Sequence, residues 1–197
     1  MALENIKVVV FDLGGVLLQL RNPIRTFGLD MTEATFLERW LKSPGVREFE
    51  RGAVDAEIFA RSMVGELELD MQWQEFLRRF DSWPERIFPE TMALLDAVPA
   101  GIGRALLSNI NASHWGRADI AGALDGHFDR MFLSFRTGLL KPDPQAFAQV
   151  ATAFGLPAET FLFFDDNPLN VSAAVESGMQ AFICKGPSDA HRILGQL

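Results

Sequence analysis

Five short apolar runs are spread along the chain, and none of them alternates between hydrophobic and polar positions. The runs are residues 7–11, 104–107, 131–133, 161–164 and 180–183. A strand that is apolar on both faces is typical of a parallel sheet with helices packed on each side. Helical patterns accompany the runs, at residues 89–98, 113–124, 143–154, 170–177 and 189–194. Strand alternating with helix predicts a three-layer, Rossmann-like α/β domain with a parallel sheet.

Residues 20–88 break this alternation, because they show helical periodicity and no convincing strand. Apolar residues recur there at spacings of three and four, after polar residues that can cap a helix. The expected caps and helices are Thr32 or Asp30 with 33–41, Asp55 with 56–67, and Asp70 with 71–80. We therefore predict a core formed by residues 1–19 and 89–197, and a helical cap at 20–88. The cap is expected above the carboxyl edge of the sheet, where α/β folds bind ligands.

The composition limits the classes of function. The chain has 197 residues, 48% of them hydrophobic, which suits one domain or a core domain with an insertion. Its formal net charge of −8 disfavours binding to nucleic acid, whose phosphate backbone would be repelled. A small anionic substrate can still bind, because the local charge of a cleft can oppose the net charge.

The chain shows no sign of an export signal or a membrane span. Its first residues are too few and too polar for a secretory signal, and it has no uncharged apolar run of about 18 residues. The single cysteine, Cys184, allows no intrachain disulfide. We therefore expect a cytoplasmic protein, whose oligomeric state the sequence does not indicate.

Polar residues follow the first two predicted strands directly. Asp12 ends the first strand and precedes Gly14 and Gly15. It is either a turn residue or a carboxylate nucleophile in a loop that a ligand can approach closely. Ser108 and Asn109 follow the second strand, where they are either a helix cap or groups that bind a ligand. Each motif taken alone leaves both interpretations open.

Two further motifs lie toward the C-terminus. Lys141 precedes a proline at the entrance of a predicted helix, where a solvated loop charge is the simpler interpretation. Asp165 and Asp166 end a strongly apolar strand, and adjacent carboxylates repel each other unless something compensates. A bound Mg²⁺ would compensate, because this ion prefers oxygen ligands, although a polar cluster at a helix start is the alternative.

The four motifs together are more specific than any one of them. All follow predicted parallel strands, so they are expected at the same edge of one sheet. Together they supply a carboxylate nucleophile, a hydroxyl and an amide, a cation and a metal site. Phosphoryl transfer requires this combination of positioning and positive charge around the phosphate oxygens.

In this order the motifs resemble those of the haloacid dehalogenase superfamily, and the resemblance covers the whole chain. The chain most resembles the α-D-glucose-1-phosphate phosphatase-like group, which shares the Asp-Leu-Gly, Leu-Ser-Asn and Phe-Phe-Asp-Asp-Asn segments. The segment Glu50-Arg51-Gly52 in the cap is also similar. The resemblance implies the strand order 5-4-1-2-3 and a Mg²⁺-dependent phosphatase. Its expected substrate is a small phosphorylated metabolite, for example a sugar 1-phosphate.

The resemblance also implies a set of metal ligands. Asp12 is expected to ligate Mg²⁺ as well as to attack phosphorus, and the backbone carbonyl of Gly14 would be a second ligand. Asp166 would be the main direct carboxylate ligand of the fourth motif. Asp165 would either ligate the ion or hold a metal-bound water.

The phosphate group is expected to contact the second and third motifs. The resemblance implies that the Ser108 hydroxyl and the backbone amide of Asn109 bind phosphate oxygens. Lys141 would neutralise both the phosphate and Asp12.

The chain departs from the family pattern at Gly14, where most phosphatases of the superfamily carry a second aspartate. That residue is a general acid–base, which is typically worth about 10²–10⁴ in rate. The substrate can have a leaving group that needs little protonation, such as an anomeric or acyl phosphate. Alternatively another side chain substitutes, with His114 as the candidate, although a histidine there is otherwise expected at the surface. In the third interpretation the chain is a weak or inactive relative that binds a phosphorylated ligand.

A 2-haloacid dehalogenase also lacks the second aspartate, but it needs no metal, and the pair Asp165-Asp166 argues against it. A sugar phosphomutase is disfavoured because it relies on the missing acid. The cap is expected to select the substrate. The candidates are Arg21, Arg47, Glu50 and Arg51, with Trp40 and Trp83 as apolar walls. The alternative is that the arginines are merely exposed and the tryptophans belong to the core of the cap.

Overall fold

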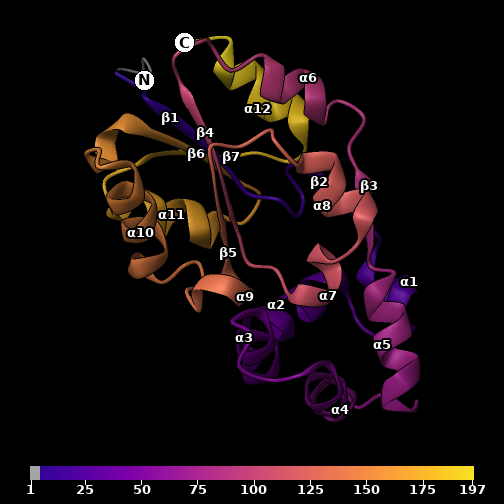
Figure 1. Cartoon of the computed structure of the whole chain (residues 1–197). Coiled ribbons are helices and arrows are strands. Elements are labelled where there is room, and N and C mark those ends of the chain that lie inside the picture. The colour runs from indigo at the N-terminus through magenta and orange to yellow at the C-terminus, as the bar shows by residue number, and fades with distance from the viewer. Residues whose placement is uncertain (1–4) are drawn as a thin grey trace.

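The computed structural model describes residues 5–197, and a five-stranded parallel sheet forms its centre (Figure 1). The strands are β1 (Val8–Phe11), β4 (Gly103–Ser108), β5 (Arg130–Leu133), β6 (Phe161–Asp165) and β7 (Gln180–Ile183). They lie in the order β5-β4-β1-β6-β7, and each neighbouring pair is parallel. Counted along the chain as strands 1 to 5 and read from the β7 edge, this is the order 5-4-1-2-3. The predicted fold class is therefore confirmed.

Helices cover both faces of the sheet and complete the three layers (Figure 1). One face carries α10 (Pro144–Phe154) and α11 (Pro168–Glu176), and the other carries α6 (Thr91–Asp96), α8 (Ala118–Leu124) and α12 (Pro187–Leu194). Alternate residues of β1 enter the two cores between these layers. Val8 and Val10 pack on the α10 side, and Val9 and Phe11 pack on the α12 side. The middle strand is therefore apolar at every position, because neither of its faces meets water.

A second, separate hydrophobic core lies in the segment between β1 and β4. The segment contains α1 (Pro23–Phe27), α2 (Glu33–Lys42), α3 (Pro44–Glu50), α4 (Ala56–Glu66) and α5 (Trp73–Asp81). Its core is mainly aromatic, with Phe36, Trp40 and Phe80 among its buried side chains. These helices gather at the carboxyl edge of the sheet, in the lower part of Figure 1. The boundary at residues 20–88 stays a prediction.

Some details of this segment agree with the sequence prediction and others differ from it. The predicted caps Thr32 and Asp55 accept hydrogen bonds from the first turns of α2 and α4. Asp70 does not cap a helix, because α5 begins only at Trp73 and has no side-chain cap. The short helices α1 and α3 were not predicted. Each begins with a proline, after a residue whose side chain caps the first turn.

The prediction that residues 20–88 contain no strand is wrong. β2 (Leu18–Leu20) and β3 (Pro84–Ile87) form an antiparallel two-stranded ribbon through which the chain enters and leaves the helical segment. Their pattern gives little indication of a strand, because β3 carries two adjacent charged residues and starts with a proline. The two strands are stabilised by pairing with each other, in a register that places Leu18 opposite Ile87.

The predicted helix at residues 113–124 is divided into α7 (Ala112–Trp115) and α8. The chain turns at Arg117, whose backbone is extended and whose guanidinium donates to the carbonyl oxygens of Asp81 and Pro84. The short helices α9 (Ser134–Thr137) and η1 (Ala158–Thr160) also belong to the part of the chain that forms the sheet and its covering helices. The first of these begins at the carboxyl end of β5, close to the helical segment.

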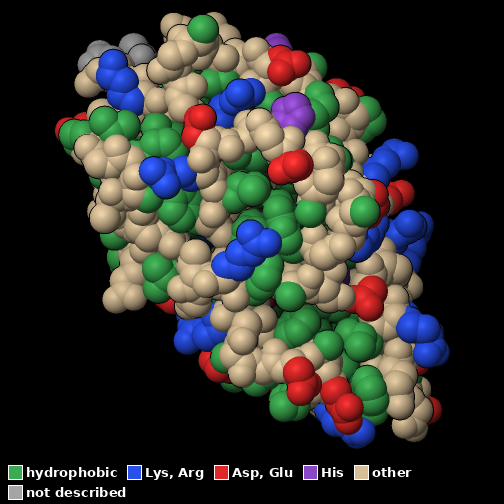
Figure 2. Space-filling view, viewed as in Figure 1, with side chains coloured by type: hydrophobic (Ala, Val, Ile, Leu, Met, Phe, Trp, Pro, Cys, Tyr) green, Lys and Arg blue, Asp and Glu red, His purple; other side chains and the backbone are tan. Residues whose placement is uncertain are grey.

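The described part of the chain has no helix that is long and apolar enough to cross a membrane. Cys184 is buried. On the face shown in Figure 2, acidic and basic side chains are intermingled over the whole molecule. The expected lack of a secretory signal rests partly on residues 1–4, which lie outside the described residues.

Candidate functional site

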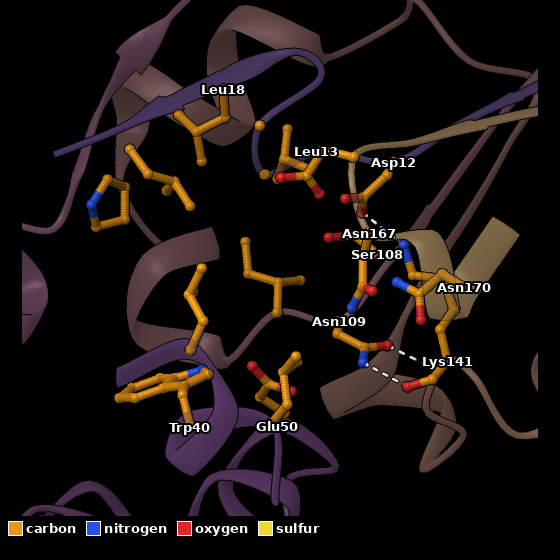
Figure 3. A pocket seen from close by; sticks show the side chains of 18 of the residues that line it. Asp12, Leu13, Leu18, Trp40, Glu50, Ser108, Asn109, Lys141, Asn167 and Asn170 are labelled. Carbon is orange, nitrogen blue, oxygen red and sulfur yellow. Dashed lines mark hydrogen bonds and ion pairs between the residues drawn. The ribbon is translucent and has the colours of Figure 1, made fainter. Parts of the chain in front are cut away.

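The ends of the parallel strands meet a cavity of about 1190 Å³ that lies between the sheet edge and the helical segment. It is lined by most of the predicted site residues: Asp12, Gly14, Ser108, Asn109, Lys141 and Asp166. Asp165 is fully buried directly behind this wall. The four motifs, which span more than 150 positions of the sequence, are thus brought together as predicted. Figure 3 shows Asp12, Ser108, Asn109 and Lys141 on one side of the cavity.

Lys141 joins two of the motif carboxylates. Its Nζ lies 2.7 Å from Asp12 Oδ1 and 2.6 Å from Asp165 Oδ2, and its side chain is almost completely buried. Burial alone would lower the pKa of Lys141, but the two carboxylates outweigh it and raise that pKa, so the ammonium group stays charged. Lys141 is therefore a fixed cation beside Asp12, and the expectation of a solvated loop charge is wrong.

Asp12 lies in buried surroundings that disfavour the ionised form of its carboxyl group. Burial raises the pKa of Asp12 to about 8, although the charge and hydrogen bond of Lys141 act in the opposite direction. The neighbouring carboxylates of Asp165 and Asp166 raise it further. A second positive charge beside Asp12 would therefore favour its ionised form, which is the form that can act as a nucleophile.

The two adjacent carboxylates of the fourth motif have different surroundings. Asp165 accepts hydrogen bonds from the Asn167 backbone N–H (2.8 Å) and from Asn170 Nδ2 (3.0 and 3.1 Å), in addition to its contact with Lys141. Both of its oxygens are thus already occupied. Asp166 is only partly buried and lines the cavity. Burial, followed by the charge of Asp165, raises the pKa of Asp166 to about 6.

The donor set at this edge fits Mg²⁺. Asp12, Asp165 and Asp166 each offer a carboxylate oxygen, and these oxygens lie within 4.8 Å of one another. Hard oxygen donors of this kind are the ligands that Mg²⁺ prefers. Within residues 5–197 no hydrogen bond occupies the carbonyl oxygen of Gly14, the fourth predicted ligand. Asp12 and Asp166 have the freer oxygens, and the occupied Asp165 is better suited to positioning Lys141.

Hydrogen bonds connect Asn109 of the second motif to Lys141 of the third. The Asn109 side chain donates to the Lys141 carbonyl oxygen and accepts from the Lys141 backbone N–H, both at 2.9 Å. Ser108, at the end of β4, is buried and lines the cavity beside it. The side chain of Asn109 is therefore a brace between two loops, which leaves its backbone amide and the Ser108 hydroxyl as the groups suited to bind an anion.

Three residues that support the site were not predicted. Asn167 and Asn170 hold Asp165, and the buried Ser134 hydroxyl lies 2.6 Å from the Glu50 carbonyl oxygen of α3. Ser134 also accepts from the Ile110 backbone N–H at 2.9 Å, so it connects the helical segment to the core. One indication of such a role was available in the sequence, because Asn170 starts a predicted helix shortly after Asp165 and Asp166.

Of the four charged candidates in the helical segment, Arg47 and Glu50 line the cavity, and Arg21 and Arg51 do not. Arg47 pairs with Asp143 at 3.1 Å, between α3 and the start of α10. Burial raises the pKa of Glu50 to about 7 against the opposing charges of Lys141 and Arg47. The two tryptophan candidates, Trp40 and Trp83, belong to the aromatic core and also form part of the cavity wall.

The expectation that His114 lies at the surface is wrong. Its ring stacks on Phe80 with the centroids 4.1 Å apart, and its Nε2 donates to the Phe80 carbonyl oxygen at 2.9 Å. Burial lowers the pKa of His114 to about 4, so the ring is neutral near pH 7. Its single proton is then committed to the backbone of Phe80. His114 lines the cavity, and its hydrogen bond to the Phe80 carbonyl oxygen argues against a role as the acid that Gly14 lacks.

Comparisons with known proteins show the family and the fold of this chain. A family model described as haloacid dehalogenase-like hydrolase matches residues 6–178. The chain is similar to the D-ribitol-5-phosphate phosphatase of Bacteroides thetaiotaomicron, with 28% identity over 200 residues that cover 90% of this chain and 91% of that protein. It is also similar to the enolase-phosphatase E1 of Persephonella marina, with 30% identity over 118 residues. That alignment covers 60% of this chain but only 46% of that protein.

A solved structure shares the fold. It is a HAD family enzyme from Bacteroides thetaiotaomicron in complex with magnesium and inorganic phosphate, with a TM-score of 0.69 and 23% identity. The superposition covers 91% of this chain and 94% of that chain. At this identity the likeness concerns the arrangement of the sheet, its helices and the inserted segment.

Proposed function

Since this chain belongs to the haloacid dehalogenase-like hydrolase family, we propose that it is a Mg²⁺-dependent phosphatase of a small phosphate monoester. The reaction would pass through an aspartyl-phosphate on Asp12. One observation carries the proposal: Asp12, Ser108, Lys141 and Asp166 converge at one wall of a single cavity. The relatives named above support it, because two of them are phosphatases.

In the first step, an oxygen of the Asp12 carboxylate attacks phosphorus, and the bond between phosphorus and the ester oxygen breaks. The hydroxyl of Ser108 and the backbone N–H of Asn109 donate to the phosphate oxygens. Lys141 holds Asp12 at 2.7 Å and places a positive charge beside the transferring group. Such fixed charges and donors are the main source of catalysis in phosphoryl transfer.

Asp12, Asp166 and the carbonyl of Gly14 would hold the Mg²⁺, with Asp165 behind them. When bound, the ion would supply positive charge against the phosphate oxygens and the carboxylates. Asp165 keeps Lys141 in place through their 2.6 Å contact. In the second step, water attacks the aspartyl-phosphate, which releases inorganic phosphate and restores the Asp12 carboxylate.

No carboxylate stands at position 14 to protonate the leaving oxygen. A substrate whose oxygen leaves without much protonation therefore suits this site, as an anomeric, acyl or aryl phosphate would. The sugar 1-phosphate suggested by the resemblance meets this requirement, but it is not the only class that does.

The test is the hydrolysis of p-nitrophenyl phosphate, whose phenolate leaves readily. We expect turnover with Mg²⁺, none with EDTA, and none in Asp12→Asn. Asp96→Asn, an exposed carboxylate on α6 outside the cavity, is the matched control and should retain activity. Chloride release from a 2-haloacid without metal would instead identify a dehalogenase. Absence of turnover with every phosphate ester, together with retained phosphate binding, would indicate a binding protein.

A further inference from the structure

Next to Gly14, where the missing acid of the proposed reaction would stand, the cavity is bordered by an apolar side chain. The Leu20 side chain covers Gly14, because its Cδ1 would lie 3.6 Å from a β-carbon placed there. The position of the missing acid thus borders on an aliphatic side chain and not on a polar one. Figure 3 shows Leu18 and Trp40 across the cavity from Lys141 and Asn170.

Leucines from three separate elements line this cavity although they are exposed to solvent. Leu20 of β2 is 38% exposed, Leu37 and Leu41 of α2 are 41% and 47% exposed, and Leu169 of α11 is 59% exposed. Single exposed leucines are ordinary, but convergent ones at a concave surface mark a ligand site. The four side chains belong to both the helical segment and the core, so a ligand between them would contact both.

The charged side chains that α2 brings to the same rim are already paired. Lys42 Nζ lies 2.7 Å from Glu38, and Glu33 accepts from Asn22 Nδ2 at 3.1 Å. On α3, Arg47 is paired with Asp143. These groups have partners within the protein, whereas the hydroxyl groups of a sugar would need several free donors and acceptors. The α2 and α3 part of the wall therefore favours an apolar organic group over a free sugar; the polar residues Glu90, Lys185 and Ser188 line the cavity elsewhere.

Glu50 is the one charged residue that α2 and α3 bring to the cavity without a hydrogen bond to its carboxyl group from residues 5–197. It stands beside Asn109 in Figure 3, close to the phosphate end. Its raised pKa, about 7, makes it neutral in a large fraction of the molecules at neutral pH. An apolar group of a ligand beside Glu50 is therefore less unfavourable than one beside an ionised glutamate.

We propose that the preferred substrates are phosphate monoesters whose organic group is apolar, aryl or alkyl, and that Leu20, Leu37, Leu41 and Leu169 bind that group. This inference rests on the proposed phosphatase function and names its substrate class. The aryl members of the class also have a leaving oxygen that departs without an acid at Gly14. The cavity volume of about 1190 Å³ leaves ample room for such a group beyond the phosphate.

The experiment uses phenyl phosphates with a 4-methyl, 4-propyl or 4-hexyl substituent, which differ in apolar length but hardly in the basicity of the phenolate. We expect kcat/KM to rise about twofold to fourfold per methylene group until the cavity is filled. Glucose 1-phosphate should be a poorer substrate than the hexyl ester. Equal kcat/KM along the series, or a preference for glucose 1-phosphate, would overturn the inference while the phosphatase proposal stands.

The double variant Leu37→Ser/Leu41→Ser should reduce the ratio of kcat/KM between the hexyl and methyl esters at least threefold. The control is Ile58→Ser on α4, which is 54% exposed but lies outside the cavity, and it should keep the wild-type ratio. If the leucines serve only to seal the helical segment against the core, the double variant will lower kcat/KM for all esters equally. That result would also overturn the inference.

Binding of alkylphosphonates of increasing length, measured by calorimetry with Mg²⁺, gives a readout that does not need turnover. We expect affinity to increase with chain length. Length-dependent binding without hydrolysis of any ester would reject the phosphatase and retain the apolar site. Affinity that does not change with length would reject the apolar site, whether or not the protein is a phosphatase.

Discussion

A β-carbon on Gly15 would lie 2.3 Å from Oδ2 of Asp166, so this carboxylate fills the space that the glycine leaves open. Gly15 also has a φ of +74°, in the left-handed region that favours glycine. Gly14, one position earlier, differs in both respects. Its β-carbon would make an ordinary contact of 3.6 Å with Leu20, and its φ is not positive.

We therefore expect Gly15→Ala and Gly14→Ala to behave differently. Gly15→Ala should displace Asp166 and weaken Mg²⁺ binding about 10-fold to 100-fold, a loss comparable with that caused by disturbing groups around a metal site. It should also cost about 1–2 kcal/mol of stability through the left-handed backbone. Gly14→Ala is the matched control: it keeps the backbone carbonyl that is a proposed ligand, so it should bind Mg²⁺ as the wild type does. Calorimetric titration with Mg²⁺ and urea unfolding measure both effects, and equal losses in the two variants would contradict the role given to Asp166.

The missing general acid can be tested at Gly14, because a β-carbon there would make only an ordinary 3.6 Å contact with Leu20. Gly14→Asp should raise kcat/KM most for esters with a basic leaving oxygen, such as alkyl phosphates, by up to about 10²-fold. The gain for p-nitrophenyl phosphate should be much smaller. Gly14→Asn has nearly the same shape and no proton to give, so it should show no gain. A loss of activity on every ester in Gly14→Asp alone would count against the argument from the missing acid.

The middle of the sheet was predictable because β1 and β6 are buried on both faces, and that leaves unbroken apolar runs in the sequence. The convergence of Asp12, Ser108 and Asp166 followed from their positions after parallel strands. The ribbon of β2 and β3 could not be predicted in the same way. Its strands are short, half-exposed and held by pairing with each other, which leaves no periodicity to detect.

The surroundings of single side chains were harder to predict than the elements that carry them. Two adjacent residues at a strand end point to opposite sides, so Asp165 enters the core and Asp166 faces the cavity. The sequence alone did not indicate which of the two would be saturated by hydrogen bonds. His114 is buried by the stacking of Phe80, which lies 34 positions earlier in the chain. Local pattern carries no information about such a contact.

Lys141 lies between the buried carboxylates of Asp12 and Asp165, which makes its removal costly. Lys141→Met would leave two buried carboxyl groups without the cation that bridges them. We expect a loss of about 3–5 kcal/mol in the free energy of unfolding, as for other buried pairs that lose one partner. Turnover should fall at least about 100-fold, because a fixed charge beside the transferring group is lost.

The control for Lys141→Met is Arg192→Met, which removes the exposed pair of Arg192 with Asp189 on α12. Exposed pairs of this kind contribute about 0–1 kcal/mol, so both stability and turnover should stay near the wild-type values. Urea unfolding and p-nitrophenyl phosphate turnover give the two measurements. Wild-type turnover in a folded Lys141→Met protein would exclude the role proposed for Lys141.

The burial of His114 predicts a dependence of stability on pH. Its pKa is about 4 in the folded protein and near 6.5 when the chain is unfolded, so between these values the unfolded state binds more protons. Lowering the pH from 6.5 toward 4 should therefore reduce the free energy of unfolding, by at most about 3 kcal/mol from this residue. Above pH 6.5 the residue should contribute no pH dependence.

Other buried groups titrate over part of the same pH range. The test therefore compares the pH dependence of the free energy of unfolding between the wild type and two variants. His114→Gln keeps an amide that can donate to the Phe80 carbonyl oxygen but cannot be protonated, and it should lose this component of the slope. His191→Gln, at an exposed position on α12, should retain the wild-type slope. Urea unfolding at a series of pH values between 4 and 8 measures the three slopes. Identical slopes in wild type and His114→Gln would mean that His114 is not held neutral, and the imidazole would then again be a candidate for the acid that Gly14 lacks.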